Sequence, residues 1–213
     1  MTFMTNPITR ARWISPARLD RFEQVAIVIL WVLLARRVYS ATNPLAPLIL
    51  VGETAVVIFV LLRRPTEVIS LRLGDWLLAI TATFMPLLIV PADTPAALHA
   101  FIPLGVGLAL VGNAVQLAAK LFLRRSFGIA PANRGIKTGG MYKIVRHPMY
   151  AGYLLMHIGI LVLMPTVQNF IIYSISWSAQ IPRLLAEERL LSADPAYRGL
   201  LAKTRWRLIP AVF

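Results

Sequence analysis

Three reactive side chains gather where a polar stretch of the chain meets an apolar one. Arg146, His147 and Tyr150 supply a cation, an imidazole and a phenol, and the apolar run YLLMHIGILVLM begins three residues after the last position of VRHPMY. Pro148 keeps His147 out of the helical backbone region, so His147 belongs to a loop and can face a ligand. Gly152, on the first helical turn, allows a ligand or another backbone to approach closely. Basic residues in this position are also typical of an ordinary membrane anchor.

A second reactive group is the carboxylate pair Glu187 and Glu188, at the inner end of the last apolar segment. Carboxylates near a membrane helix are costly unless they are paired or solvated. Arg183 precedes Glu187 by four residues, so we expect the two to pair on one helix face. A solvated ion pair at the membrane surface is the simpler alternative to a ligand site.

Isolated polar residues inside the apolar segments form a third group. His99 and His157 are buried by pattern, and a hydrogen bond to a neighbouring helix is the expected role of each. The three histidines of the chain have no metal-ligand spacing, so no metal is expected. Glu53 is a weaker functional candidate, because it could also lie near the outer end of its segment.

The composition predicts the scaffold that positions these groups. Of the 213 residues 58% are hydrophobic, the mean hydropathy is +0.69, and 15% are charged, where a soluble domain has about 25%. Several apolar runs are long enough to cross a bilayer, which takes ~20 residues each. We therefore predict an all-α integral membrane protein with about five to six transmembrane helices, forming one membrane domain over 1–213. The absence of cysteine excludes disulfides and thiolate chemistry.

The first residues, MTFMTNPITRARWISPARLDRF, lack the apolar h-region and the cleavage site of a signal peptide. The first apolar segment is therefore expected to stay in the mature protein. The polar stretch 126–149 contains glycines and prolines typical of a loop, and 192–213 is a basic tail. The last two segments should form a C-terminal helical hairpin, in which the shorter one could be half of a deep hairpin rather than a full span. The expected segments are 22–40, 44–62, 75–91, 96–123, 150–164 and 168–191.

The basic residues give the topology. The net charge of +13 is compatible with nucleic-acid binding, but no DNA-binding motif, P-loop or GxGxxG fingerprint is present. With six crossings and both termini inside, 20 of the 22 Lys and Arg residues fall on the cytoplasmic side, Arg36 and Arg37 being the exceptions. The chain thus suits a bacterial inner membrane, with no nucleic-acid partner. The blocks 126–152 and 183–210 flank one hairpin and should meet.

The combined pattern resembles the isoprenylcysteine carboxyl methyltransferase and phospholipid methyltransferase superfamily. The resemblance covers 126–213 and rests on TGGMYKIVRHPMYAGYLL, a hydrophobic hairpin, EERLL and DPAYRGLLAKTRWRLIP. It implies a membrane enzyme that uses S-adenosylmethionine in a cytosolic pocket. Met141 and Leu200 depart from the family pattern, which often has proline and tyrosine there. The residues that match the family positions are Tyr142, Arg146, His147, Pro148, Tyr150, Gly152, Glu187 and Glu188, with Tyr197, Arg207 and Pro210 in the tail.

The chemistry of these residues agrees with that cofactor. The carboxylate of S-adenosylmethionine suits Arg146, its ammonium and sulfonium suit Glu187 and Glu188, and its adenine suits walls made by Tyr142, His147 and Tyr150. A carboxylate acceptor needs only an orienting cation, for which Arg207 or Arg205 is a candidate. An amine or thiol acceptor must lose a proton, and Glu187, Glu188 or His147 would then be the base.

Two other functions remain open at this level. A sterol-type reductase has a related membrane fold but uses a nicotinamide cofactor, and the chain is short for that group. A membrane transporter or assembly factor would need a polar path through the first four segments, where Glu53 and His99 are the hints. The favoured prediction is methyl transfer to a lipophilic molecule or a lipid headgroup that reaches the site from the bilayer.

Overall fold

A computed structural model describes residues 16–63, 66 and 68–213, so Arg10, Arg12 and Arg64 of the charge argument lie outside the described residues. The described chain is helical, as expected, and its β-type pairings are two isolated bridges. Short 3₁₀ segments flank several helices, among them η1 (Met85–Leu88), η2 (Ala96–Phe101) and η4 (Gly140–Lys143). The α-helices are α1 (Pro16–Tyr39), α2 (Pro47–Leu62), α3 (Leu73–Phe84), α4 (Ile102–Leu123), α5 (Pro148–Leu163), α6 (Val167–Leu191) and α7 (Pro195–Lys203).

Local sequence signals explain where these helices begin. A proline stands in the first turn of α2, α4, α5 and α7, where its missing N–H costs nothing. The side chain of Thr166 accepts a hydrogen bond from the backbone N–H of Asn169 before α6, and Asp194 caps α7 through the N–H of Ala196. The predicted segments are confirmed as helices, although α1 begins at Pro16 and not at 22, and α3 ends at Phe84, with η1 continuing to Leu88 and not to 91. Helix α7 was not predicted, since the tail has no apolar run to reveal it.

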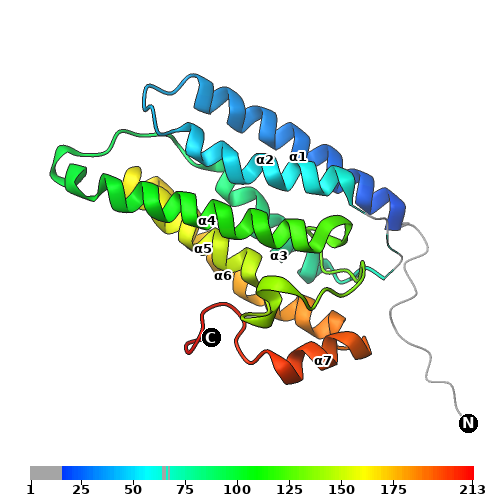
Figure 1. Cartoon of the computed structure of the whole chain (residues 1–213). Helices are drawn as coiled ribbons and strands as arrows, with labels where there is room; N and C mark the ends of the chain where they lie inside the picture. The colour runs from blue at the N-terminus through cyan, green and yellow to red at the C-terminus, as the bar shows by residue number, and fades with distance from the viewer. Residues whose placement is uncertain (1–15, 64–65, 67) are drawn as a thin grey trace, which may run out of the picture.

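The helices pack as neighbouring pairs (Figure 1). Helices α1 and α2 lie side by side, α4 runs along α5, and α3 packs on α6. Helices α5 and α6 are joined by a short turn, as the hairpin prediction requires, yet each has its main contacts with another helix. Because α4 and α3 are their main partners, α5 and α6 are separated from each other along most of their length. Side chains from other elements can therefore lie between them.

Small residues make the close contact between α4 and α5. A Cβ added at Gly152 would lie 2.5 Å from the Gln116 nitrogen and 2.7 Å from the Gly112 oxygen. One added at Gly159 would lie 2.6 Å from the Ala109 nitrogen. Backbones that approach this closely leave no space for larger side chains, as is common between membrane helices.

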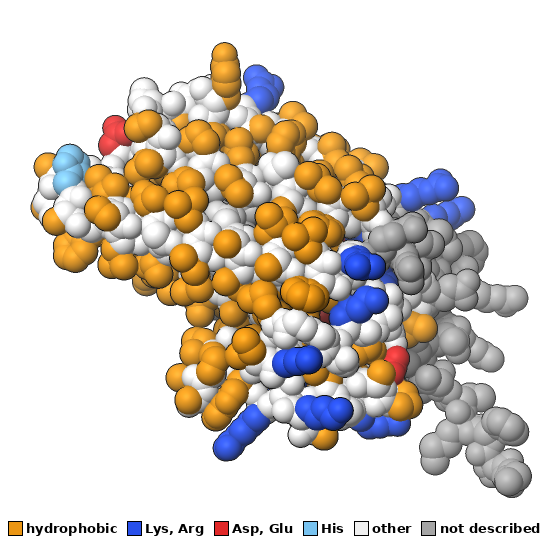
Figure 2. All heavy atoms as spheres, viewed as in Figure 1, with side chains coloured by type: hydrophobic (Ala, Val, Ile, Leu, Met, Phe, Trp, Pro, Cys, Tyr) orange, Lys and Arg blue, Asp and Glu red, His pale blue; other side chains and the backbone are white. Residues whose placement is uncertain are grey.

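The surface and one helix fit a bilayer. The continuous helical segment Ala96–Leu123, made by η2 and α4, is long and apolar enough to cross a membrane, and only 22% of its apolar window is buried. Helices α2 and α5, and α3 with η1, are apolar but shorter, so the count of five to six spans stays a prediction. Figure 2 shows hydrophobic side chains over most of the body that α1, α2, α4 and α5 form.

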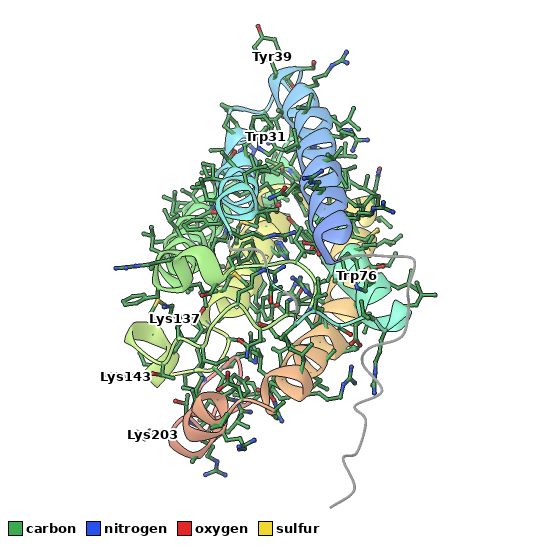
Figure 3. All side chains as sticks on the ribbon, turned by 90° about the vertical axis from the view of Figure 1, so that its right-hand side faces the viewer. Trp31, Tyr39, Trp76, Lys137, Lys143 and Lys203 are labelled. Carbon is green, nitrogen blue, oxygen red and sulfur yellow. The ribbon has the colours of Figure 1, made fainter. Side chains whose placement is uncertain are left out.

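The basic side chains gather at one end of the molecule. Figure 2 shows Lys and Arg mainly at the end that carries α7. In Figure 3, Lys137, Lys143 and Lys203 lie together at that end, while Tyr39 lies at the opposite end. This separation agrees with the two basic blocks expected to meet on one side of the membrane.

Candidate active site

Backbone hydrogen bonds join the RHPMY element, which is residues 146–150, to the tail 192–213. The N–H of Arg146 donates to the carbonyl of Trp206 at 2.9 Å, and the N–H of His147 donates to the carbonyl of Arg207 at 2.8 Å. The Thr204 hydroxyl donates to the carbonyl of Tyr142 at 3.1 Å. These bonds hold the tail against the start of α5, so the two polar blocks form one site, as their flanking of one hairpin suggested.

Glu188 is the ionic centre of this site. Its Oε1 lies 2.8 Å from Arg146 Nε and 3.2 Å from His147 Nε2, and its Oε2 accepts a hydrogen bond from Arg207 Nε at 2.9 Å. This part of α6 lies against Arg146, at the start of α5, and Arg207 of the basic tail. Burial by itself would raise the pKa of Glu188, but hydrogen bonds from His147 and Arg207 and the charge of Arg146 lower it to about 2.

Glu187 makes a different contact. It is partly exposed, and one of its oxygens accepts a hydrogen bond from the Tyr150 hydroxyl at 2.7 Å. The rings of Tyr150 and His147 stack with centroids 5.5 Å apart and an angle of 7° between their planes. Glu187 thus fixes the phenol, and the stacked rings present a flat wall next to a carboxylate.

The predicted pairing of Arg183 with Glu187 is wrong. Arg183 is buried and donates from Nε and Nη2 to the carbonyl of Ile129, at 3.2 and 2.7 Å. Its guanidinium also lies 5.3 Å from the centre of the Tyr150 ring. The loop carbonyl competes with Glu187 for this cation, and spacing along one helix does not reveal a competitor that is distant in sequence.

A cavity of about 710 Å³, counted with its open mouth, lies against these groups. Its walls include six of the residues carried over from the family pattern, which are Tyr142, Arg146, His147, Tyr150, Glu187 and Tyr197. Pro148 and Gly152 are not among the lining residues, since Pro148 starts α5 and Gly152 packs on α4. Glu188 and Arg207 stand behind the wall, and Pro210 is exposed.

The cavity walls carry polar groups that the described residues do not satisfy. The buried Tyr197 hydroxyl has no hydrogen-bond partner there. Arg146 touches Glu188 through Nε, and no hydrogen bond joins its terminal nitrogens to a described residue. Burial, reinforced by the charges of Glu188 and Glu187, raises the pKa of Tyr197, so its hydroxyl keeps its proton. Two donors are therefore free to bind a ligand.

The loop 126–135, which supplies much of the remaining wall, is held by elements from the first half of the chain. The backbone N–H of Ser70 donates to the carbonyl of Pro131 at 2.9 Å. Glu23, in α1, accepts the N–H of Ala130 at 3.0 Å and forms a buried ion pair with Arg63. Sequence reasoning missed Glu23, because a single acid in a mixed segment gives no signal of a partner 107 residues away.

The isolated polar residues were predicted with mixed success. His157 is buried and its Nδ1 accepts a hydrogen bond from Trp177 on α6 at 3.1 Å, as expected. The prediction that His99 is buried is wrong: it is exposed and lies 3.1 Å from the Thr94 carbonyl in the same turn. Glu53 is buried near the middle of α2 and not at its end. Lys120, one of the 20 basic residues expected on the cytoplasmic side, is fully buried at the inner end of its helix.

Comparisons with known proteins bear on the same region. No curated protein matches the chain. The family model described as phospholipid methyltransferase matches residues 99–194. That range contains the RHPMY element, the α5–α6 hairpin and both carboxylates, which carry the resemblance seen in the sequence. The predicted resemblance is confirmed over residues 99–194, which match the family model of the phospholipid methyltransferases.

Proposed function

We propose that the protein transfers a methyl group from S-adenosylmethionine to a lipophilic acceptor that reaches the site from the bilayer. The observation that carries the proposal is the cavity beside the Glu188 cluster, whose wall presents an acidic side chain, free donors and stacked rings together. The family match supports the reaction class. The donor, the acceptor and the roles of individual residues are our inference from the geometry.

The residues present fit the cofactor. The terminal nitrogens of Arg146 would hold its carboxylate, and Glu187 would face its ammonium group. His147 and Tyr150 would form a wall for its adenine, and Tyr197 would donate a hydrogen bond. When bound, S-adenosylmethionine supplies a methyl group on a sulfonium, and on transfer the sulfur keeps the electron pair of the broken S–C bond while the acceptor heteroatom forms the new bond.

The two carboxylates have different roles in this proposal. Glu188 is a weak base, because three positively charged or protonatable partners hold its pKa at about 2. It therefore positions Arg146, His147 and Arg207. Among the residues that the structure describes, Glu187 accepts a hydrogen bond from Tyr150 alone, and it lines the cavity. If the acceptor must lose a proton, Glu187 is the better candidate to receive it.

Binding of radiolabelled S-adenosylmethionine to the detergent-purified protein tests the proposal. Tyr197→Phe removes a hydroxyl that has no partner in the described chain, so the ligand-free protein should keep its unfolding temperature. The cofactor affinity should fall roughly 3- to 10-fold, the value of one hydrogen bond. Arg146→Gln should weaken binding further.

Lys203→Gln is the control for charge removal, since Lys203 is exposed and outside this cavity. It should bind the cofactor as the wild type does. A folded wild-type protein that binds no S-adenosylmethionine would refute the proposal, and nicotinamide cofactors would then be tested.

A further inference from the structure

An open groove lies where α4 ends and the chain turns toward η4. It measures about 680 Å³, counted with its open side, and its lining residues are Leu121, Phe122, Arg124, Lys137 and Gly139. Leu121 and Phe122 belong to the last turn of α4, and Arg124 is the first residue of the short helix η3 (Arg124–Ser126). One half of the groove is therefore apolar, and the other half carries two cations.

The two cations of the groove have no partner within the described chain. Arg124 and Lys137 are exposed, and no hydrogen bond or ion pair joins either side chain to a described residue. None of the residues that line the groove is acidic. Two like charges that share one groove repel each other, so an anion that lies between them interacts favourably with both.

The backbone of Arg124 is strained. Its φ of +53° and ψ of −122° lie in a region that is costly for a residue with a Cβ and that glycine adopts freely. Such residues are found where a ligand is held, because binding then offsets the strain. Within the described chain the Arg124 side chain makes no hydrogen bond, ion pair or ring contact, so the strain points to a partner outside the chain.

The apolar half of the groove continues along the surface of α4. Leu110, Leu117 and Leu121 are exposed and lie on one face of this helix. At 1.5 Å per residue this stripe is roughly 16 Å long, which is about half of the ~30 Å hydrocarbon core of a bilayer. Figure 2 shows basic side chains where the hydrophobic surface over α4 ends. The stripe and the groove together match one phospholipid, with a place for an acyl chain and a place for its charged headgroup.

The apolar wall of the groove is built by a specific contact. A Cβ added at Gly140, the first residue of η4, would lie 2.4 Å from Cζ of Phe122. Gly140 also has a φ of +58°, which favours glycine. The Phe122 ring thus packs directly on the turn that begins η4, so the groove has a fixed aromatic side.

We propose that this groove binds an anionic phospholipid, with its phosphate between Arg124 and Lys137 and an acyl chain along Leu121 and Leu117. The occupant is a lipid and not a free phosphate, because the cations stand at the end of an apolar stripe on a helix long and apolar enough to cross a membrane. The lipid is a bound partner and not a methyl acceptor. The inference therefore goes beyond the proposed function and does not depend on it.

A second basic groove provides an internal comparison. It lies between η4 and α7, measures about 1000 Å³ with its open side, and includes Lys143 and Lys203 among its lining residues. No residue of α4 lines it. This groove offers the same number of cations without the leucine stripe, so it should attract anions but should not hold a lipid in one place.

Native mass spectrometry of the delipidated protein in detergent tests the inference directly. Phosphatidylglycerol and phosphatidylcholine with identical acyl chains are titrated separately, and the dissociation constant of the first bound lipid is measured for each. Two cations should make phosphatidylglycerol bind at least about tenfold more tightly. Glycerol 3-phosphate, which offers the phosphate without acyl chains, should not displace it at equal concentration.

Single charge removals locate the site. Arg124→Gln and Lys137→Gln should each lower phosphatidylglycerol affinity about fivefold and leave phosphatidylcholine affinity within about twofold. Lys143→Gln and Lys203→Gln remove the same charge from the second groove, and each should change phosphatidylglycerol affinity by less than about twofold. S-adenosylmethionine affinity should stay unchanged in Arg124→Gln, because Arg124 does not line the first cavity.

Arg124→Gly separates a ligand-binding role of this residue from a structural one. Glycine adopts a φ of +53° without strain, so the unfolding temperature of the lipid-free protein should stay constant or rise. Phosphatidylglycerol affinity should nevertheless fall at least about fivefold. A lower unfolding temperature with unchanged lipid affinity would mean that Arg124 serves the fold and not a lipid.

Three further results would overturn the inference. Equal affinities of the wild type for the two lipids would show that the groove does not select an anionic headgroup. Equal losses in the variants of both grooves would show attraction by the overall charge of the chain. Displacement by glycerol 3-phosphate would show a phosphate site that needs no lipid. Failure of the cofactor to bind would refute the proposed function separately, since the lipid titration does not use the cofactor.

Discussion

At the residue scale, Glu187 and Glu188 show how one step along a helix changes the chemistry of a carboxylate. Glu188 turns toward Arg146, His147 and Arg207, whereas Glu187 meets the Tyr150 hydroxyl and the cavity. Successive helical positions differ by about 100°, so adjacent acids face different surroundings. One carboxylate is held ionised by its partners, and the other remains available to a ligand.

The pKa of Glu188 gives a prediction about pH. Its folded value of about 2 lies below the ordinary value of 4.5, so ionised Glu188 stabilises the fold above pH 4.5, and this stabilisation disappears as the pH falls from 4.5 to about 2. We expect the difference in unfolding temperature between wild type and Glu188→Gln to be constant from pH 7 to about pH 5 and to shrink below pH 4.5. A difference that shrinks between pH 7 and pH 6 would contradict the assignment.

Much of the candidate site could be predicted from residue types, and the predictions that failed have a common cause. Six of the residues expected from the family pattern line one cavity, because motif residues follow a local backbone signal. The contact from Arg183 to Ile129 and that from Glu23 to Ala130 join parts of the chain far apart in sequence. No local pattern encodes such contacts. One missed signal was available: Asn113, Gln116 and Lys120 share one face of α4 at helical spacing.

At the element scale, the close contact between the backbones of α4 and α5 fixes the position of α5 and of the RHPMY residues at its start. Gly152 lies one turn into α5 and faces the backbone of α4, so the position of α5 depends on this contact. The sequence left open whether Gly152 admits a ligand or a neighbouring backbone. The structure shows the neighbouring backbone, and the role of Gly152 in cofactor binding therefore stays a prediction.

Gly152→Ala should separate the two helices. Its new Cβ would lie 2.5 Å from the Gln116 nitrogen, and overpacking of this kind costs about 1–3 kcal/mol. The unfolding temperature of the ligand-free protein should fall. Gly107→Ala is the matched control in α4, since a Cβ there meets nothing within 4 Å and the alanine should stabilise the helix slightly. Equal unfolding temperatures for the two variants would show that this contact tolerates a methyl group.

Helix positions could be predicted from hydropathy because each apolar run is a local property. The amphiphilic tail gave no such signal, and α7 was missed. The sequence also did not reveal which helices pack against each other. Hydropathy shows that α5 and α6 follow each other, but the choice of α4 and α3 as their main partners depends on small-residue faces and polar contacts that form only in three dimensions.

At the scale of the whole molecule, the separation of basic and apolar surfaces predicts an orientation. If Ala96–Leu123 crosses the bilayer, Asp93 and Lys143 lie on opposite sides of it. The chain contains no cysteine, so Asp93→Cys and Lys143→Cys each create one reactive thiol at an exposed position. A membrane-impermeant maleimide should label Asp93→Cys in intact cells and Lys143→Cys only in inside-out vesicles. Labelling of both from the same side would refute this topology.

The contact between Glu23 and Ala130 has a consequence for how the chain can be divided. The family match begins at residue 99, yet the loop before the RHPMY element is tied to α1 by Glu23 and to the segment after α2 by Ser70. The first half of the chain thus supports the candidate site, besides providing much of the hydrophobic surface. A chimaera that carries residues 99–194 on another set of helices would contain the motif but lack the Glu23 and Ser70 contacts that hold the loop before it.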